Sequence, residues 1–156
     1  MTFTRTTLPA QHYLYVDREC AYGPEIAEAM ESGFGAVFGH VGAHGIAPQS
    51  MPMSIYLSMD PNILRFRAAV MVSAEDAVKT DGEIKADMLP AGDAMTTTHV
   101  GSYDKMSETH QLLWKHMEAE GIPAAMPVWE IYIDDPGNTP AEAVRTEIYR
   151  MIDGNV

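Results

Sequence analysis

Two segments of the chain have nearly the same sequence. Residues 45–62 read GIAPQSMPMSIYLSMDPN, and residues 121–138 read GIPAAMPVWEIYIDDPGN. Gly-Ile, Met-Pro, Ile-Tyr, Asp-Pro and Asn recur in the same order, and Tyr132 follows the corresponding Tyr56 by 76 positions. Because the chain has 156 residues, about twice this offset, we expect one unit used twice. Two copies related by a pseudo-twofold axis leave a cleft between them, where a small molecule can bind.

The two copies differ at one chemically important position. Met53-Ser54 of the first copy corresponds to Trp129-Glu130 of the second. A small neutral side chain is therefore replaced by a carboxylate within a motif that is otherwise shared. This difference makes Glu130 the first candidate functional residue.

The first copy, about residues 11–72, has the pattern of a strand, a helix and two further strands. Alternating β-formers predict the first strand, and an apolar stripe at helical spacing follows a Gly-Pro-Glu start. We expect strands over residues 13–19, 53–59 and 64–72, with the helix beginning at Gly23-Pro24-Glu25. The acidic segment over residues 73–83 is expected to link the copies.

The second copy, about residues 84–153, repeats this order. Gly101-Ser102-Tyr103 is expected to open its helix, and Gly121 to close it. We expect its strands over residues 95–100, 129–134 and 147–152, with a strand-like segment over residues 84–89 before them. The predicted fold class is α+β: a duplicated strand-helix-strand-strand module with two antiparallel sheets, each covered by one helix, in a single domain over residues 1–156.

Composition excludes several classes of function. The formal net charge of −12 argues against nucleic-acid binding, because phosphate contacts need Lys and Arg. No apolar run is long enough for a membrane helix, and the N-terminus lacks the apolar stretch of a signal peptide. A single cysteine, Cys20, suits a reducing compartment, so we expect a cytoplasmic protein.

The sequence predicts neither a metal site nor a cofactor. His40 and His44 are four residues apart, but glycines interrupt the helix there and no Cys or carboxylate joins them at ligand spacing. There is no phosphate-binding loop, and Cys20 has no activating partner in the sequence. The expected partner is a small molecule; a protein partner is a further option, and the sequence sets no oligomeric state.

The second copy carries motifs that resemble a known family. The segments PAGDAMTTTHVGSYDKM and MPVWEIYIDDPGNTPAEAVRTEIY are similar to the GyrI-like effector-binding domain. The matching motifs are G-x-Y at the start of the second helix, W-E-x-Y, the D-P turn and R-T-E-I-Y, and the first copy fits through Met53 to Tyr56. The family includes gyrase-inhibitory proteins and ligand-sensing domains of multidrug-responsive regulators. No segment before residue 13 could hold a helix-turn-helix, so we expect a stand-alone member.

The resemblance implies a ligand cleft between the copies, with the glutamate of the W-E-x-Y strand inside it. This role carries over to Glu130. Aromatic residues line the cleft in the family, and Tyr132 and Tyr149 match by motif position, while Tyr56 is a candidate by internal symmetry.

The strand pattern gives an independent argument for the same residue. Glu130 and Tyr132 share one face of their strand, while the apolar face with Trp129 is expected to meet the helix. A carboxylate among aromatic rings is costly to desolvate unless it is paired. It could be kept for a cationic ligand, or as an acid or base acting on a bound electrophile. Alternatively, it only pairs with Arg145 or a histidine.

Other candidates carry less weight. Met95 could form part of an adaptable pocket wall, although most methionines fill cores. His99 could border the cleft, or could be a hydrogen-bonded structural histidine. His110 is expected at the surface or an interface, and Glu147 either reaches the cleft or is a solvated charge at its rim.

Two hypotheses follow. The first is a stand-alone protein that binds apolar, cationic or drug-like compounds through Glu130 and the surrounding tyrosines, with Met95 and His99 as further ligand-binding candidates. The alternative is a hydrolase, because some stand-alone members of the family open reactive cyclopropane compounds. In that case Glu130 would be the catalytic acid or base.

Overall fold

The computed structural model describes residues 1–154 and contains eight strands and two long helices. The helices α1 (Glu25–Ala43) and α2 (Met106–Ala119) lie close to the predicted ranges. The strands are β1 (Thr4–Leu8), β2 (Gln11–Ala21), β3 (Met53–Tyr56), β4 (Ile63–Met71), β5 (Lys85–Leu89), β6 (Gly92–Val100), β7 (Ala124–Tyr132) and β8 (Arg145–Ile152). Short 3-10 helices are η1 (Asp76–Val78), η2 (Tyr103–Lys105) and η3 (Ala141–Ala143).

All eight strands belong to one antiparallel sheet, so the expectation of two sheets is wrong. The order is β1-β6-β8-β7-β3-β4-β2-β5. β3 and β7, the corresponding strands of the two halves, pair with each other from Met53–Ile131 to Tyr56–Val128 and join the halves edge to edge. If β1, β2, β3 and β4 are exchanged with β5, β6, β7 and β8, the same strand order results, read in the opposite direction. The two halves of the sheet therefore have the same arrangement on either side of the β3–β7 pair.

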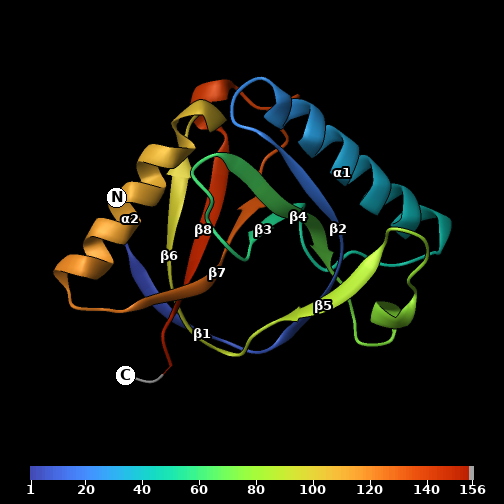
Figure 1. Cartoon of the computed structure of the whole chain (residues 1–156), viewed down its shortest axis with the longest axis horizontal. Helices are drawn as coiled ribbons and strands as arrows, with labels where there is room; N and C mark the ends of the chain where they lie inside the picture. Colours follow the sequence, from blue (N-terminus) through green and yellow to red (C-terminus); the bar gives the residue numbers. More distant parts are fainter. Residues whose placement is uncertain (155–156) are drawn as a thin grey trace.

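Both helices pack on the same face of the sheet. α1 contacts β2 and β4, and α2 contacts β6, which leaves β3, β7 and β8 between the helices. Figure 1 shows α1 and α2 on either side of these middle strands, inclined toward each other at their N-terminal ends. None of the helices within residues 1–154 is long and apolar enough to cross a membrane.

The opposite face of the sheet is also buried. Its core includes Tyr13, Met53, Trp129 and Met151, which are all less than 5% exposed. Leu89 of β5 and Ala94 of β6 belong to this second core, and Leu8 at the end of β1 packs against it. A sheet with apolar side chains on both faces cannot reveal from alternation alone which face the helices cover.

One glycine sets how closely α1 approaches the sheet. Gly33 is buried against β4, and a Cβ atom placed there would lie 2.7 Å from the Cβ of Ala68. Real Cβ atoms do not approach so closely, so this position requires glycine. The close contact holds the first turns of α1 near the centre of the sheet, where Met30 reaches the residues described next.

Candidate functional site

Glu130 lies on β7 at the centre of the sheet, where the two halves of the strand order meet. In the β3–β7 pair it is directly opposite Ser54, its counterpart in the first half. The residue is 6% exposed and lies on the face that the helices cover. The sequence-based expectation that Glu130 points away from the helices is therefore wrong, because Trp129 and Ile131 point into the second core on the other face.

Three side chains contact the carboxylate of Glu130. The hydroxyls of Tyr132 and Tyr56 donate to Oε1, at 2.7 and 3.2 Å. Nε2 of His110, on α2, is 2.6 Å from Oε2. Arg145, the other partner considered from the sequence, binds Asp134 at 2.8 Å instead. We call Glu130, Tyr132, Tyr56, His110 and Ser54 the Glu130 cluster.

Tyr132 connects the cluster to both halves of the molecule. Its hydroxyl is 2.8 Å from Oγ of Ser54, which in turn lies 3.5 Å from the sulfur of Met30 on α1. Its ring contacts Phe34 of α1 edge-on at 5.9 Å and Tyr103 of η2 at 5.5 Å between centroids. The space above Glu130 is therefore filled by aromatic side chains from both helical segments.

The two hydroxyls at Glu130 stay neutral over the physiological range. Burial, and then the charge of Glu130, raise the pKa of Tyr56 and of Tyr132 well above 10. The pKa of Tyr103 is also raised, by burial and by nearby carboxylates. A neutral phenol next to a carboxylate acts as a hydrogen-bond donor, as Tyr56 and Tyr132 do toward Oε1 of Glu130.

His110 is a part of the cluster that the sequence-based expectation of a surface residue missed. It lies on the same face of α2 as the buried residues Met106, Leu113 and Met117, and its side chain is 19% exposed. It follows Phe34, its counterpart in the first half, by the same 76 positions that separate Ser54 and Glu130. The asymmetry that identified Glu130 therefore also identifies the histidine that contacts it.

The structure brings only some of the predicted residues to Glu130. Tyr149 lies on the opposite face, where its ring stacks on Trp129 at 5.2 Å and its hydroxyl donates to Glu147 at 3.2 Å. Met95 packs in the core beneath α2. The ring nitrogens of His99 lie 2.6 Å from Oγ1 of Thr109 and 2.9 Å from the carbonyl oxygen of Ser102, which is a structural arrangement.

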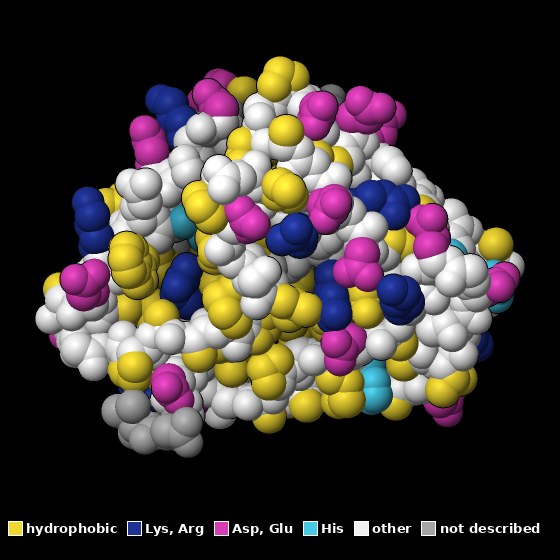
Figure 2. Space-filling model, in the orientation of Figure 1, with side chains coloured by type: hydrophobic (Ala, Val, Ile, Leu, Met, Phe, Trp, Pro, Cys, Tyr) yellow, Lys and Arg dark blue, Asp and Glu magenta, His cyan; other side chains and the backbone are white. Residues whose placement is uncertain are grey.

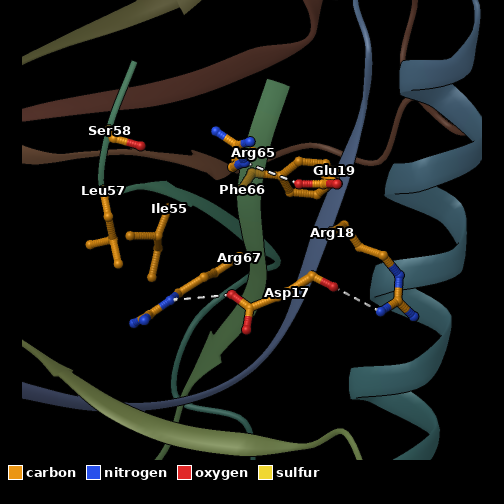
Figure 3. A pocket seen from close by; sticks show the side chains of 9 residues that line it. All are labelled: Asp17, Arg18, Glu19, Ile55, Leu57, Ser58, Arg65, Phe66 and Arg67. Carbon is orange, nitrogen blue, oxygen red and sulfur yellow. Dashed lines mark hydrogen bonds and ion pairs between the residues drawn. The ribbon is translucent and has the colours of Figure 1, made fainter. Parts of the chain in front are cut away.

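Two cavities of the molecule lie away from the Glu130 cluster. The larger, of about 420 Å³, is lined by residues of β2, β3 and β4. In Figure 3, Arg67 points toward Asp17 and across to Ile55, while Arg18 points away toward α1. Figure 2 shows hydrophobic side chains in the middle of this view, with basic and acidic side chains interspersed beside them.

The charged groups of the larger cavity already satisfy one another. Arg67 donates to Asp87 and to Tyr13 and lies 4.0 Å above the ring of Tyr15. Arg65 pairs with Glu19, directly opposite it on β2, and with Asp60 in the loop before β4. A smaller cavity of about 180 Å³ is lined by Trp129, Tyr149 and the β1–β2 connection. Among residues 1–154, no group of three or more His, Cys, Asp or Glu side chains is arranged to hold a metal.

The Glu130 cluster has a clear chemical capacity. One nearly buried carboxylate lies among aromatic rings, with two neutral phenols on one oxygen and an imidazole on the other. Such an arrangement can hold an organic cation, or can transfer a proton through the carboxylate–imidazole pair.

Comparison with known proteins gives one family and one fold. The model of the GyrI-like small molecule binding domain matches residues 1–153. The C-terminal domain of EcmrR is similar at a TM-score of 0.72 and 20% identity, with 97% of each chain covered. SAV2435 bound to tetraphenylphosphonium is similar at 0.68 and 12%, with 99% of this chain and 96% of that chain covered. A hydrolase from Listeria innocua is similar at 0.66 and 17%, covering 96% and 91%. No curated protein matches the chain.

Proposed function

The chain belongs to the GyrI-like small molecule binding domain family, and from this premise we propose that it binds lipophilic organic cations at Glu130. The observation that carries the proposal is a glutamate only 6% exposed, whose carboxylate contacts two tyrosines and a histidine, with Phe34 packed on one of these tyrosines. Tyr56 and Tyr132 would supply ring faces as well as hydroxyls, and Met30 would adapt the wall to ligands of different shape.

The physical reason is the high free energy of a buried charge. A carboxylate removed from water is destabilising unless partners compensate it, and an apolar residue in its place would usually give a more stable core. A cation with a large apolar surface compensates the charge and also buries its own apolar area. Aromatic rings around it add cation–π attraction of about 0.5–2 kcal/mol each.

Ligand access requires movement of the side chains that cover the site. Phe34 and Tyr103 pack on the ring of Tyr132, and His110 contacts the carboxylate of Glu130, so these side chains cover the site. Tyr103 is 41% exposed and lies in the short helix η2, so it can swing out by giving up its ring contact with Tyr132. We propose that the N-terminal ends of α1 and α2 separate when the ligand enters.

A relative provides the probe for this proposal. SAV2435 was observed with tetraphenylphosphonium, a permanently charged lipophilic cation. The likeness to this chain is one of fold, so the proposal here depends on the chain's own Glu130. Because the charge of this cation is permanent, the ligand does not gain or lose a proton during a binding experiment.

Isothermal titration calorimetry with Glu130→Gln tests the proposal. We expect wild type to bind tetraphenylphosphonium, and the substitution to weaken binding at least tenfold, because the amide keeps the shape but not the charge. Glu147→Gln is the matched control, since Glu147 lies in the same sheet on the opposite face. Neutral triphenylphosphine oxide should bind wild type and Glu130→Gln equally. Equal affinity of both variants for the cation would contradict the proposal.

The other expectations about the protein's context remain proposals. We propose a cytoplasmic protein, because a chain with a single cysteine, Cys20, suits a reducing compartment. The net charge of −12 favours attraction of cations over nucleic acid. A broad, multidrug type of specificity would agree with Met30 at the edge of the Glu130 cluster, because a methionine side chain adapts to ligands of different shape.

A hydrolase is the second candidate, favoured by the pair formed between Glu130 and His110. A carboxylate 2.6 Å from an imidazole resembles the base-and-orienter arrangement of general acid–base catalysis. In this case Glu130 would activate water against an electrophilic compound such as a cyclopropane. Mass spectrometry of cyclopropane substrates incubated with wild type and Glu130→Gln decides: turnover lost in the variant supports the hydrolase, and no turnover in either protein rejects it.

A further inference from the structure

Arg150, on β8, is a cation without a counter-ion in a protein whose net charge is −12. Its Nε atom is buried and has no hydrogen-bond partner, and within residues 1–154 no carboxylate forms an ion pair with the guanidinium. Seven of the ten Lys and Arg side chains do pair with a carboxylate, and Lys105 and Lys115 are exposed. Among the described residues, Arg150 is therefore the partly buried cation that the protein leaves unpaired.

Arg150 lies close to the Glu130 cluster, on the same face of the sheet. Ile148 is directly opposite Glu130 and packs in the core beneath α2. Arg150 follows Ile148 by two residues on β8, so it shares the face that the helices cover. Diagonal neighbours of this kind in an antiparallel pair are about 7–8 Å apart. One carboxylate and one guanidinium therefore lie on adjacent strands at a separation that a single small molecule can span.

Apolar side chains from both halves flank Arg150. Val128 of β7 and Met95 of β6 are directly opposite it, and they are 0% and 3% exposed. Val128 belongs to the core beneath α1 and Met95 to the core beneath α2, so Arg150 lies where these two cores meet. Burial lowers the pKa of Arg150, because its neighbours do not replace the lost hydration of the guanidinium.

The first half of the molecule shows that the fold does not need a cation at this position. Arg150 lies two residues beyond the partner of Glu130, and its counterpart Val70 lies two residues beyond Ala68, the partner of Ser54. Val70 is 0% exposed and belongs to the core beneath α1. An apolar side chain is therefore sufficient for packing here, and an unpaired guanidinium is the less stable choice. The second half carries two opposite charges where the first half carries none.

We infer that Arg150 binds an oxyanion of the ligand, so that the preferred ligands of the Glu130 site are zwitterionic. The inference rests on the proposed function and adds the ligand class: a lipophilic cation that also carries a carboxylate. The N–H groups of a guanidinium form a planar fork that matches the two oxygens of a carboxylate. The cationic centre would lie at Glu130 and the carboxylate at Arg150, and each charge of the protein would gain a partner.

A matched series of triphenylphosphonium compounds tests the inference by isothermal titration calorimetry at pH 7.5. (4-Carboxybutyl)triphenylphosphonium is a zwitterion at this pH, whereas its methyl ester has a similar shape and only the positive charge. We expect wild type to bind the zwitterion roughly tenfold or more tightly than the ester, because hydrogen bonds between two charged groups are stronger than those of a neutral ester.

Arg150→Met removes the guanidinium and keeps an unbranched apolar side chain. We expect this variant to bind the zwitterion no more tightly than the ester, and to keep the urea midpoint of wild type or exceed it. Arg150→Gln takes its place if the methionine variant does not fold. Lys115→Gln is the matched control, because it removes an exposed positive charge from α2, and it should retain the preference for the zwitterion.

Failure of this inference and failure of the cation site give different results. Equal binding of zwitterion and ester by wild type, or a preference that persists in Arg150→Met, overturns the role of Arg150 and leaves the cation site in place. The third probe, 6,6,6-triphenylhexanoate, carries the carboxylate without the positive charge. It should bind more weakly than the zwitterion, and its binding should be lost in Arg150→Met but not in Glu130→Gln. Binding of the hexanoate alone rejects the cation site and with it the zwitterionic ligand class, and absence of binding by all three probes rejects both proposals.

Discussion

The hydroxyl of Tyr132 makes the shorter of the two phenolic hydrogen bonds to Glu130. Its removal should lower the free energy of unfolding by a defined amount. Tyr132→Phe keeps the ring, and therefore the packing on Phe34 and Tyr103. It deletes the 2.7 Å hydrogen bond to the carboxylate of Glu130, a residue only 6% exposed, and the 2.8 Å contact with Oγ of Ser54. Hydrogen bonds to charged groups contribute about 1.5–3 kcal/mol, so we expect the free energy of unfolding to fall by about 2 kcal/mol.

This magnitude should be visible in both chemical and thermal unfolding. Urea denaturation at pH 7.5 should show a lower midpoint with an unchanged m-value. For a chain of this length, about 2 kcal/mol corresponds to a Tm decrease of roughly 4–8 °C. The remaining phenol, Tyr56, donates at 3.2 Å and is too long a contact to compensate.

Tyr149→Phe is the control for loss of a tyrosine hydroxyl in the same sheet. Its hydroxyl donates to Glu147 at 3.2 Å in a half-buried position, so we expect a loss below about 1 kcal/mol. A double-mutant cycle then isolates the contact: in a Glu130→Gln background, Tyr132→Phe should cost about 1 kcal/mol less than in wild type. Equal costs in both backgrounds, or wild-type stability of Tyr132→Phe, would refute the reasoning.

Two other predictions concern the sheet and its tyrosines. Gly33→Ala should lower the free energy of unfolding by about 1–3 kcal/mol in urea denaturation, because the new Cβ would meet Ala68 at 2.7 Å; an unchanged midpoint would show that α1 can shift away. Burial raises the pKa of Tyr13 from 10.0 to about 12, and those of Tyr56 and Tyr132 are raised as well. When the pKa of a phenol is higher in the folded than in the unfolded protein, its contribution to stability is complete below the unfolded pKa and is lost as the pH rises through the folded pKa. The urea midpoint should therefore decline between pH 10 and 12. Phenolate absorbance that grows in the folded protein well below this range would contradict the prediction.

The order of elements was predictable because each half carries its own local signals. The Gly-Pro-Glu start and the helical spacing after it predicted the helix that the structure has as α1 at Glu25–Ala43, and Asp-Pro turns separated the paired strands. β1 (Thr4–Leu8) was missed, because its short polar sequence has no apolar alternation, and it is held by pairing with β6. Its partner is about ninety residues away, and such pairing is not encoded locally.

The number of sheets was not predictable from the repeat. A repeated module can close its own sheet or pair with its copy, and both choices bury the same apolar residues. The decision lies in the edge of β3, where Met53 to Tyr56 pair with β7. Backbone hydrogen bonds join β3 to β7, and the side-chain pattern of a strand does not show which strand its backbone will pair with. The sequence therefore predicted two sheets where the structure has one.

Alternation within β7 correctly placed Glu130 and Tyr132 on one face, but not which face that is. The opposite face is equally apolar because the second core, around Trp129, is buried without a helix. Tyr149 was assigned to the cluster by motif, but its register opposite Trp129 directs it to the other face. Only the pairing register between β7 and β8 determines this, and a single residue of shift reverses it.

The crystal structure of the complex with tetraphenylphosphonium is the most direct test of cation binding at Glu130. We predict the phosphonium between α1 and α2, with phenyl rings against Tyr132 and Tyr56 and with the carboxylate of Glu130 as its nearest negative charge. A cation found instead in the cavity of about 420 Å³ beside Asp17 and Glu19, with Glu130 still covered, would contradict the account.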